Sequence, residues 1–205
     1  MVFEYKGVKL EWLGHDGFRI EFKNIKILID PFRIKEQEAN LVLITHDHFD
    51  HCSIEDLKKI KGDFEIIAPY ACKNLLKSFK TSFVKPNEEI EKLGIKIKTV
   101  PAYNINKFKE PGKVFHPKEA GYVGFVLTIN GVTIYHAGDT DFIPEMKEMK
   151  VDITLLPVSG TYVMTVEEAV EAFKVIKPKV AIPMHYGSIV GSEEDAKRFE
   201  SLIRS

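Results

Sequence analysis

The sequence predicts a single α/β domain built from two similar halves. Segments typical of strands and segments typical of helices alternate twice along the chain, and no linker rich in Gly, Pro or Ser separates the two rounds. With 205 residues, of which 44% are hydrophobic, the chain is long enough to bury a sizeable core. We therefore expect residues 1–205 to fold as one domain rather than as two independent ones.

The first half begins with strands. Short runs rich in β-branched and aromatic residues are separated by turn residues, and an apolar run of buried-strand length follows them. The expected strands are Val8–Leu13, Phe18–Phe22, Ile25–Ile29 and Leu41–Thr45. Ser53, with Asp56 three residues later, then predicts the capped start of a helix that runs to Ile60. A strand at 65–68, a helix at 70–79 and a strand at 95–100 complete this half.

The second half contains the clearest hairpin of the chain, in which Asn130–Gly131 joins two strands. These strands are Tyr122–Ile129 and Val132–His136. A helix near 144–149, a strand at 153–156, a helix opened by the capping box of Thr165 and Glu168, a strand at 179–183 and a helix capped by Ser192 follow. Residues 103–121 show no periodicity. A long loop of this kind inside a domain is usually functional or a misread element.

The segment Leu43–His51, LITHDHFDH, places three histidines and two aspartates in six positions directly after a buried strand. Imidazole and carboxylate groups are ligands of zinc, iron and manganese. Alternate side chains of an extended segment share a face, so His46 and His48 can bind one ion. Asp50 and His51 follow where the chain bends toward the helix, and they can face a second ion. Four ligands are too few for two ions, so distant partners must exist.

Two later stretches supply candidate partners. In IYHAGDT, Asp139 follows the end of a strand beside Gly138, and in AIPMHYGS, His185 follows the last predicted strand. Taken alone, Asp139 is also a reasonable helix cap and His185 an ordinary loop residue. Because both follow strand ends, as the first motif does, they fit a single crevice at one edge of the fold. The candidate metal ligands are His46, His48, Asp50, His51, Asp139 and His185.

These motifs resemble the signature of the metallo-β-lactamase superfamily, His-x-His-x-Asp-His after a buried strand, which THDHFDH matches in full. DPF at Asp30–Phe32, AGDT ending at Thr140 and PMHYG at Pro183–Gly187 resemble a branch of small cytoplasmic hydrolases related to ascorbate-6-phosphate lactonase. The resemblance implies a four-layer αββα sandwich with the metal site at one edge between two sheets. It also implies that Asp139 bridges both metals and that His185 completes the second.

One position departs from the family pattern. The family supplies a third histidine to the first metal from the end of a strand in mid-chain, where this sequence has Tyr103. Three alternatives follow: Tyr103 binds as phenolate, His116 reaches in from the long loop, or both line the substrate crevice while water completes the metal's shell. Because a catalytic metal needs an open position and loops are mobile, we expect the lining role.

Two further residues are candidates for supporting roles. His15, in LGHDGF, corresponds to a histidine that the family often has near the site, although a turn role is equally reasonable. Asp30 ends a strand ahead of Pro31 and can orient a ligand histidine by accepting its second ring N–H, with a cap or turn role as the alternative.

The expected function is metal-dependent hydrolysis. Two divalent transition-metal ions, zinc in preference to manganese or iron, would share a hydroxide that attacks an ester-like bond, with Asp50 as both ligand and orienter. The expected substrate is a small metabolite carrying a lactone or phosphodiester, anionic if the lysines of the 103–121 loop steer it. The alternatives are a nuclease of the same superfamily and a metal-binding regulatory or structural protein that has lost catalysis.

Net charge and amino-acid composition limit the classes of binding partner that we expect. The net charge of −1 gives no support for nucleic acid or an anionic membrane surface as partner. The charged N-terminal residues hold no apolar stretch of signal-peptide length, and two cysteines are too few for a disulfide framework. We expect a cytoplasmic protein that acts on a small molecule, and the sequence leaves a homo-oligomer open.

Overall fold

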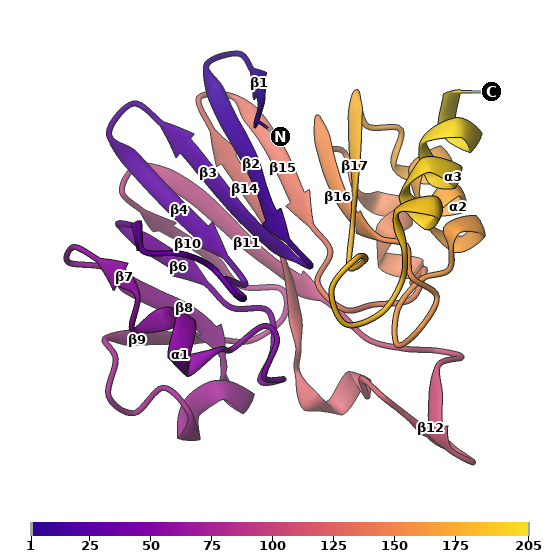
Figure 1. Ribbon diagram of the computed structural model, residues 1–205, viewed down its shortest axis with the longest axis horizontal. Coiled ribbons are helices and arrows are strands. Elements are labelled where there is room, and N and C mark those ends of the chain that lie inside the picture. The colour runs from indigo at the N-terminus through magenta and orange to yellow at the C-terminus, as the bar shows by residue number, and fades with distance from the viewer. Residues whose placement is uncertain (1, 205) are drawn as a thin grey trace.

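The computed structural model describes residues 2–204, in which two large β-sheets lie face to face (Figure 1). The first sheet has the strand order β1-β2-β3-β4-β6-β8-β9. Its strands are β1 (Val2–Tyr5), β2 (Val8–Gly14), β3 (Gly17–Phe22), β4 (Ile25–Ile29), β6 (Leu41–Leu43), β8 (Glu65–Pro69) and β9 (Thr81–Val84). Strands β1 to β4 are antiparallel neighbours, whereas β4, β6, β8 and β9 run parallel.

The second sheet has the order β10-β11-β14-β15-β16-β17. Its strands are β10 (Glu89–Lys92), β11 (Ile95–Pro101), β14 (Val123–Ile129), β15 (Val132–His136), β16 (Ile153–Pro157) and β17 (Val180–Met184). The predicted hairpin is confirmed as β14 and β15, and β15, β16 and β17 run parallel. Two small ribbons pair β5 (Gln37–Glu38) with β7 (Ile60–Lys61), and β12 (Phe108–Glu110) with β13 (Lys113–Val114).

Helices cover the outer faces of the sheets. The helical elements are α1 (Ile54–Leu57), α2 (Val166–Ile176), α3 (Glu193–Arg204) and the 3₁₀ turns η1 (Tyr70–Asn74), η2 (Lys118–Ala120) and η3 (Pro144–Glu148). Helices α2 and α3 lie beyond β16 and β17, while α1 lies on the far side of the first sheet (Figure 1). The capping box of α2 is confirmed, since the backbone N–H of Glu168 donates to Thr165 Oγ1 and that of Thr165 donates to Glu168 Oε2.

The apolar core divides into two clusters that account for these layers. The larger one fills the space between the sheets, where it joins residues of both, such as Leu10 of β2 and Phe125 of β14, and it continues beyond the second sheet to α2 and α3. The smaller one packs Leu57 of α1 and Cys72 of η1 against the outer face of the first sheet, at Val42. The order helix, sheet, sheet, helix confirms the predicted αββα sandwich.

Several predicted helices are wrong in length or type. Ser53 caps α1 as expected, but the helix ends at Leu57 because Ile60–Lys61 pairs with β5 as a strand. The helix predicted at 70–79 is only the 3₁₀ turn η1, since the chain must turn into β9, and that predicted at 144–149 is the 3₁₀ turn η3. Residues 103–121, expected to lack regular structure, contain β12, β13 and η2.

The parallel strands decide where the candidate ligands meet. Parallel pairing places the carboxyl ends of neighbouring strands at one edge of their sheet. The first motif follows β6, Asp139 follows β15, and His185 follows β17. The two sheets therefore present these three segments to a common edge of the sandwich. No helix within residues 2–204 combines the length and the apolar character that crossing a membrane requires.

Candidate metal centre

Three histidines form the first donor cluster. The Nε2 atom of His46 lies 3.1 Å from Nδ1 of His48, and Nε2 of His116 lies 3.2 Å from the same Nδ1. His46 and His116 are buried, whereas His48 is half-buried. Three imidazole nitrogens that converge in this way match the ligand number and type of a catalytic transition-metal position.

Four residues form the second cluster. His51 and His185 point into it with Asp50 and His15, and one potential ligand atom of each lies within 4.8 Å of the others. Asp50 Oδ2 lies 3.7 Å from His51 Nε2 and 2.9 Å from His15 Nε2. His15 is thus in hydrogen-bonding contact with a candidate ligand.

Asp139 connects the two clusters. Its Oδ2 atom lies 3.4 Å from His116 Nε2 and 3.8 Å from His46 Nε2 on one side, and 3.3 Å from His185 Nε2 on the other. Its Oδ1 atom lies 3.4 Å from His51 Nε2. Among residues 2–204, Oδ1 of Asp139 and Nε2 of His51 are buried without a hydrogen-bond partner. Buried polar atoms need a partner, and a metal ion could be bound by both the carboxylate oxygen and the imidazole nitrogen.

Burial and charge leave the first cluster ready for a cation. Burial lowers the pKa of His46 well below the ordinary histidine value, and it lowers that of His116 to about 4. Both rings are therefore neutral near pH 7, with a nitrogen lone pair available. Burial opposes ionisation of Asp139, but the nearby His185 and His51 hold the pKa of this carboxyl well below its usual range. Asp139 is therefore an anion between the two clusters.

A ring of polar groups orients the histidines. Asp30 Oδ2 lies 2.7 Å from His51 Nδ1, and Thr45 Oγ1 lies 2.9 Å from His46 Nδ1. Asn104 Oδ1 accepts from His116 Nδ1 at 2.9 Å, while Ser159 Oγ lies 2.9 Å from His185 Nδ1. In each case the contact holds Nδ1 and leaves Nε2 directed at the cluster, which is how metal-binding histidines are usually supported.

The backbone is unusual at the same place. His15, Asp30 and His185 all have positive φ, at 52°, 42° and 60°. Residues other than glycine rarely adopt this conformation, and it concentrates at functional sites. Gly138 is required before Asp139, because its φ is 63° and a Cβ would approach Thr45 Cβ to 3.1 Å.

Comparison with known proteins agrees with this geometry. A family model described as a beta-lactamase superfamily domain matches residues 9–185. The chain belongs to the metallo-β-lactamase superfamily. It is 35% identical over 215 residues to a metal-dependent hydrolase of Thermoplasma acidophilum, covering 96% of this chain and 91% of that one. A metal-dependent hydrolase of Thermococcus onnurineus is 34% identical over 215 residues, with 96% and 92% covered.

Solved structures give the same relationship. A candidate metal-dependent hydrolase from Parabacteroides distasonis superposes with a TM-score of 0.84 at 30% identity, covering 100% of this chain and 93% of that chain. A metallo hydrolase from the archaeon Ignicoccus hospitalis superposes with a TM-score of 0.75 at 25% identity, covering 96% and 90%. The superfamily fold therefore extends over the whole chain.

The resemblance placed Tyr103 where a third histidine for the first metal was expected. Tyr103 stands at the expected place, but its hydroxyl donates to Glu145 Oε2 at 3.0 Å and its ring lies under the Lys118 ammonium. His116, which we expected to line the crevice, instead stands in the first cluster. It reaches that position from the loop after β13.

The lysines of the 103–121 loop are largely paired with carboxylates. Lys107 contacts Asp141 and Glu168, at 3.3 Å and 2.7 Å. Lys118 and Lys113 pair with glutamates at 2.8 Å and 2.9 Å. These contacts hold the loop, so they give little support for steering of an anionic substrate.

Sequence reasoning missed several residues of the site. Thr45 directly precedes the motif and Asp16 directly follows His15, so each had a signal in its position. Asn104 and Ser159 had none, because only folding brings them to their histidines. The structure places all of the predicted residues except Tyr103 in or against the two clusters.

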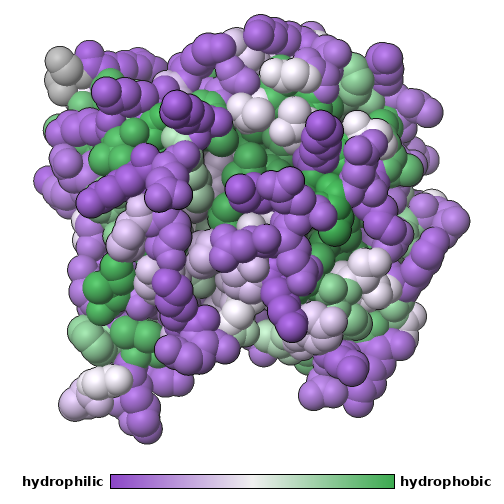
Figure 2. Space-filling view, turned by 180° about the vertical axis from the view of Figure 1, so that it is seen from behind, coloured by the Kyte–Doolittle hydropathy of each residue, from purple (hydrophilic) through white to green (hydrophobic). Residues whose placement is uncertain are grey.

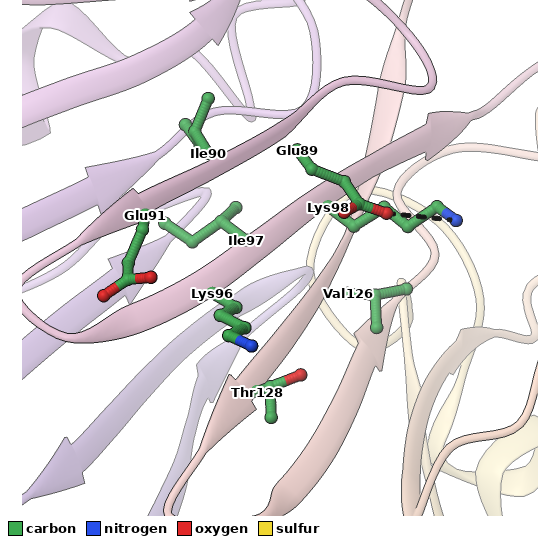
Figure 3. A pocket seen from close by; sticks show the side chains of 8 residues that line it. All are labelled: Glu89, Ile90, Glu91, Lys96, Ile97, Lys98, Val126 and Thr128. Atoms are coloured by element: carbon green, nitrogen blue, oxygen red, sulfur yellow. Dashed lines mark ion pairs between the residues drawn. The ribbon is translucent and has the colours of Figure 1, made fainter.

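The surface offers hollows of different character. From behind, polar and charged side chains cover most of the molecule, with apolar residues between them (Figure 2). A hollow on β10, β11 and β14 is lined by Lys96, Thr128 and the Glu89–Lys98 ion pair, and it contains none of the candidate ligands (Figure 3). A second hollow adjoins the first motif and is lined by Arg33 and Phe49, among others. None of the candidate ligands lines this second hollow either, but it adjoins the motif through Asp47 and Phe49, the chain neighbours of His48.

Proposed function

We propose that this protein is a hydrolase that uses two divalent transition-metal ions, zinc in preference to manganese or iron. The observation that supports it most is the position of Asp139 between two donor clusters. His46, His48 and His116 would hold the first ion, and Asp50, His51 and His185 the second, with Asp139 as the bridge. The names of the relatives, metal-dependent hydrolases, support the same reaction class.

Asp50 has the central role among the protein's own side chains in the proposed reaction. When bound, two divalent ions supply an activated water and polarise the scissile bond. Asp50 would orient that water by accepting a hydrogen bond from it, and its Oδ2 atom is itself held by His15 Nε2 at 2.9 Å. Burial opposes ionisation of Asp50, but the hydrogen bond from His15 holds the pKa of its carboxyl below the usual value. Asp50 therefore stays ionised at neutral pH.

Exposure indicates the side from which the substrate would enter. The side chain of Asp50 is 12% exposed and His48 is half-buried, whereas the Asp139 side chain is only 4% exposed. Phe49, between His48 and Asp50, is 68% exposed and packs edge-on against Phe32 with ring centroids 5.9 Å apart.

The surface beside the motif suggests the substrate's chemistry. The exposed Arg33 lies against the Phe32 ring, with Cζ 4.9 Å from its centroid, and lines the hollow with Phe49. An aromatic face beside a guanidinium suits a small substrate with an apolar portion and a negative charge. A lactone or phosphodiester of such a metabolite is therefore the proposed substrate class.

The experiment is an activity screen across lactones and phosphodiesters with metal-free protein, with zinc or manganese added back. Turnover that requires added metal is expected. Asp50→Asn keeps the shape of the side chain but removes its charge, so the rate should fall by about a hundredfold or more while the circular dichroism spectrum is retained. Metal-bound, folded protein that turns over none of these probes would support the alternative of a metal-binding protein without catalysis.

A further inference from the structure

Asp16 is a buried acid that the proposed mechanism does not use. It lies in the turn between β2 and β3, is fully buried, and among residues 2–204 neither of its carboxylate oxygens has a hydrogen-bond partner. Asp30, which is equally buried, accepts from Thr45 N at 2.8 Å and from His51 Nδ1 at 2.7 Å. A buried carboxylate without a donor is costly, so its environment must contain some other partner.

The turn that carries Asp16 is fixed to both sheets. His136 of β15 donates from Nε2 to the carbonyl oxygen of Asp16 at 2.9 Å. The backbone N–H of His185, after β17, donates to the carbonyl oxygen of His15 at 3.0 Å, and Trp12 Nε1 donates to the same oxygen at 2.9 Å. The orientation of Asp16 is therefore determined by the fold and does not depend on a mobile loop.

The side chain of Asp16 adjoins the second cluster beside the ring of His51. Its Oδ2 atom lies 3.7 Å from His51 Nδ1. Asp16, His51, Asp139 and His185 each place one potential ligand atom within 4.8 Å of the others. This group shares His51 and His185 with the cluster that contains Asp50, and it links Asp16 to Asp139.

The charge around this position also calls for cations. Four buried carboxylates meet here, and within the described chain none of them forms an ion pair with lysine or arginine; they are Asp16, Asp30, Asp50 and Asp139. Their ion-pair partners are histidines.

We propose that Asp16 is a further carboxylate ligand of the second ion, an inference that rests on the proposed two-metal site. The second position would then have three carboxylates and two histidines, against three histidines and the shared Asp139 at the first. Imidazole suits zinc, whereas carboxylate oxygens suit harder ions such as manganese. The two positions should therefore differ in metal preference, and Asp16 should strengthen manganese binding at the second.

The test uses metal-free, full-length protein titrated with manganese chloride, with free Mn²⁺ followed by its electron paramagnetic resonance signal. Wild-type protein should bind manganese at two positions. Asp16→Asn should weaken one of them by about tenfold or more and leave the other unchanged, with a smaller loss for zinc in a competition titration. Asp63→Asn, at an exposed aspartate, is the matched control and should bind as wild type does.

Urea unfolding of the metal-free variants separates a ligand from a structural residue. The carboxyl group of Asp16 is buried and accepts no hydrogen bond, so its replacement should not destabilise the metal-free protein. Asp16→Asn should therefore unfold at the same or a higher urea concentration than wild type. Asp16→Ser provides a second, smaller replacement should the amide disturb the fold. Wild-type manganese affinity in either folded variant, or lower metal-free stability with unchanged metal binding, would overturn the role of Asp16. Wild-type protein that binds no ion would overturn the proposed function as well.

Discussion

The two segments that supply the first donor cluster are held in different ways. The segment 46–51 leaves the buried strand β6 and turns directly into α1, and the backbone N–H groups of His51 and Cys52 donate to the carbonyl of His48 at 3.1 Å and 2.8 Å. Its geometry is therefore largely local. His116 comes from the loop between β13 and η2, and its position depends on residues outside that loop.

Asp141 is central to that second arrangement. Its carboxylate accepts from the backbone N–H groups of Ile105 and Asn106, at 2.6 Å and 2.8 Å, and from the side chain of Asn104 at 3.1 Å. Asn104 in turn accepts from both the backbone N–H and Nδ1 of His116. A contiguous motif thus supplies two histidines of the first cluster by local folding, whereas the third histidine depends on polar contacts between elements that are separate in the sequence.

The largest expected effect is a loss of catalytic rate, and it should be equally large for a histidine from either segment. His48→Ala and His116→Ala should each lower the rate on a verified substrate by on the order of a thousandfold, because each removes a proposed nitrogen ligand of the first ion. Lys109→Gln, at an exposed position on the same loop, is the control and should retain the wild-type rate. A His116→Ala enzyme with near wild-type turnover would show that the loop histidine only lines the site.

The pH dependence of stability should come next in size. Burial lowers the pKa of His116 to about 4 in the folded, metal-free protein, against about 6.5 when unfolded. Between these values only the unfolded chain takes up the proton, so the contribution to stability is complete above pH 6.5 and is lost as the pH falls toward 4. The loss should be about 3 kcal/mol. Urea unfolding of metal-free protein at several pH values should show that the free energy of unfolding depends less on pH in His116→Asn than in wild type. The same pH dependence in both proteins would contradict the lowered pKa of His116.

Removal of the side chains that contact the Nδ1 atoms of the histidines should affect metal affinity differently in the two segments. Asn104→Ala leaves His116 without its Nδ1 partner, so the affinity for the first ion should fall by about 10- to 100-fold in a chelator competition. The counterpart in the first segment is Thr45→Val, which removes the hydroxyl beside His46 Nδ1. Its effect should be smaller because β6 still fixes the backbone of His46. The comparison fails if the threonine variant loses more affinity than the asparagine variant.

The smallest effect concerns the loop alone. Asp141→Asn weakens the hydrogen bonds to the Ile105 and Asn106 amides by about 1 kcal/mol, since a neutral amide is a poorer acceptor than a carboxylate. Amide hydrogen exchange at these two residues should become about fivefold faster, while exchange at Leu43 in β6 stays the same. Equal acceleration at Leu43 would indicate a global loss of stability rather than a loosened loop.

The same contrast explains what could be predicted from the sequence. The motif at 46–51 and the strand that precedes it are specified by neighbouring residues, and the sequence placed them correctly. The helices predicted at 54–60 and 70–79 turned out short because residues 60–61 and 81–84 found strand partners elsewhere. The place of His116 could not be predicted for a similar reason: it depends on Asn104 and Asp141, whose contacts exist only in the folded chain.

The most direct test of whether Asp139 lies between two ion positions is the number of metal ions per chain. It would be measured by inductively coupled plasma mass spectrometry in wild-type protein and in His116→Ala, both purified without chelator. Two ions are expected in the wild type and one in the variant, with the fold retained by circular dichroism. One ion in the wild type, or two in the variant, would contradict the assignment of His46, His48 and His116 to a metal position of their own.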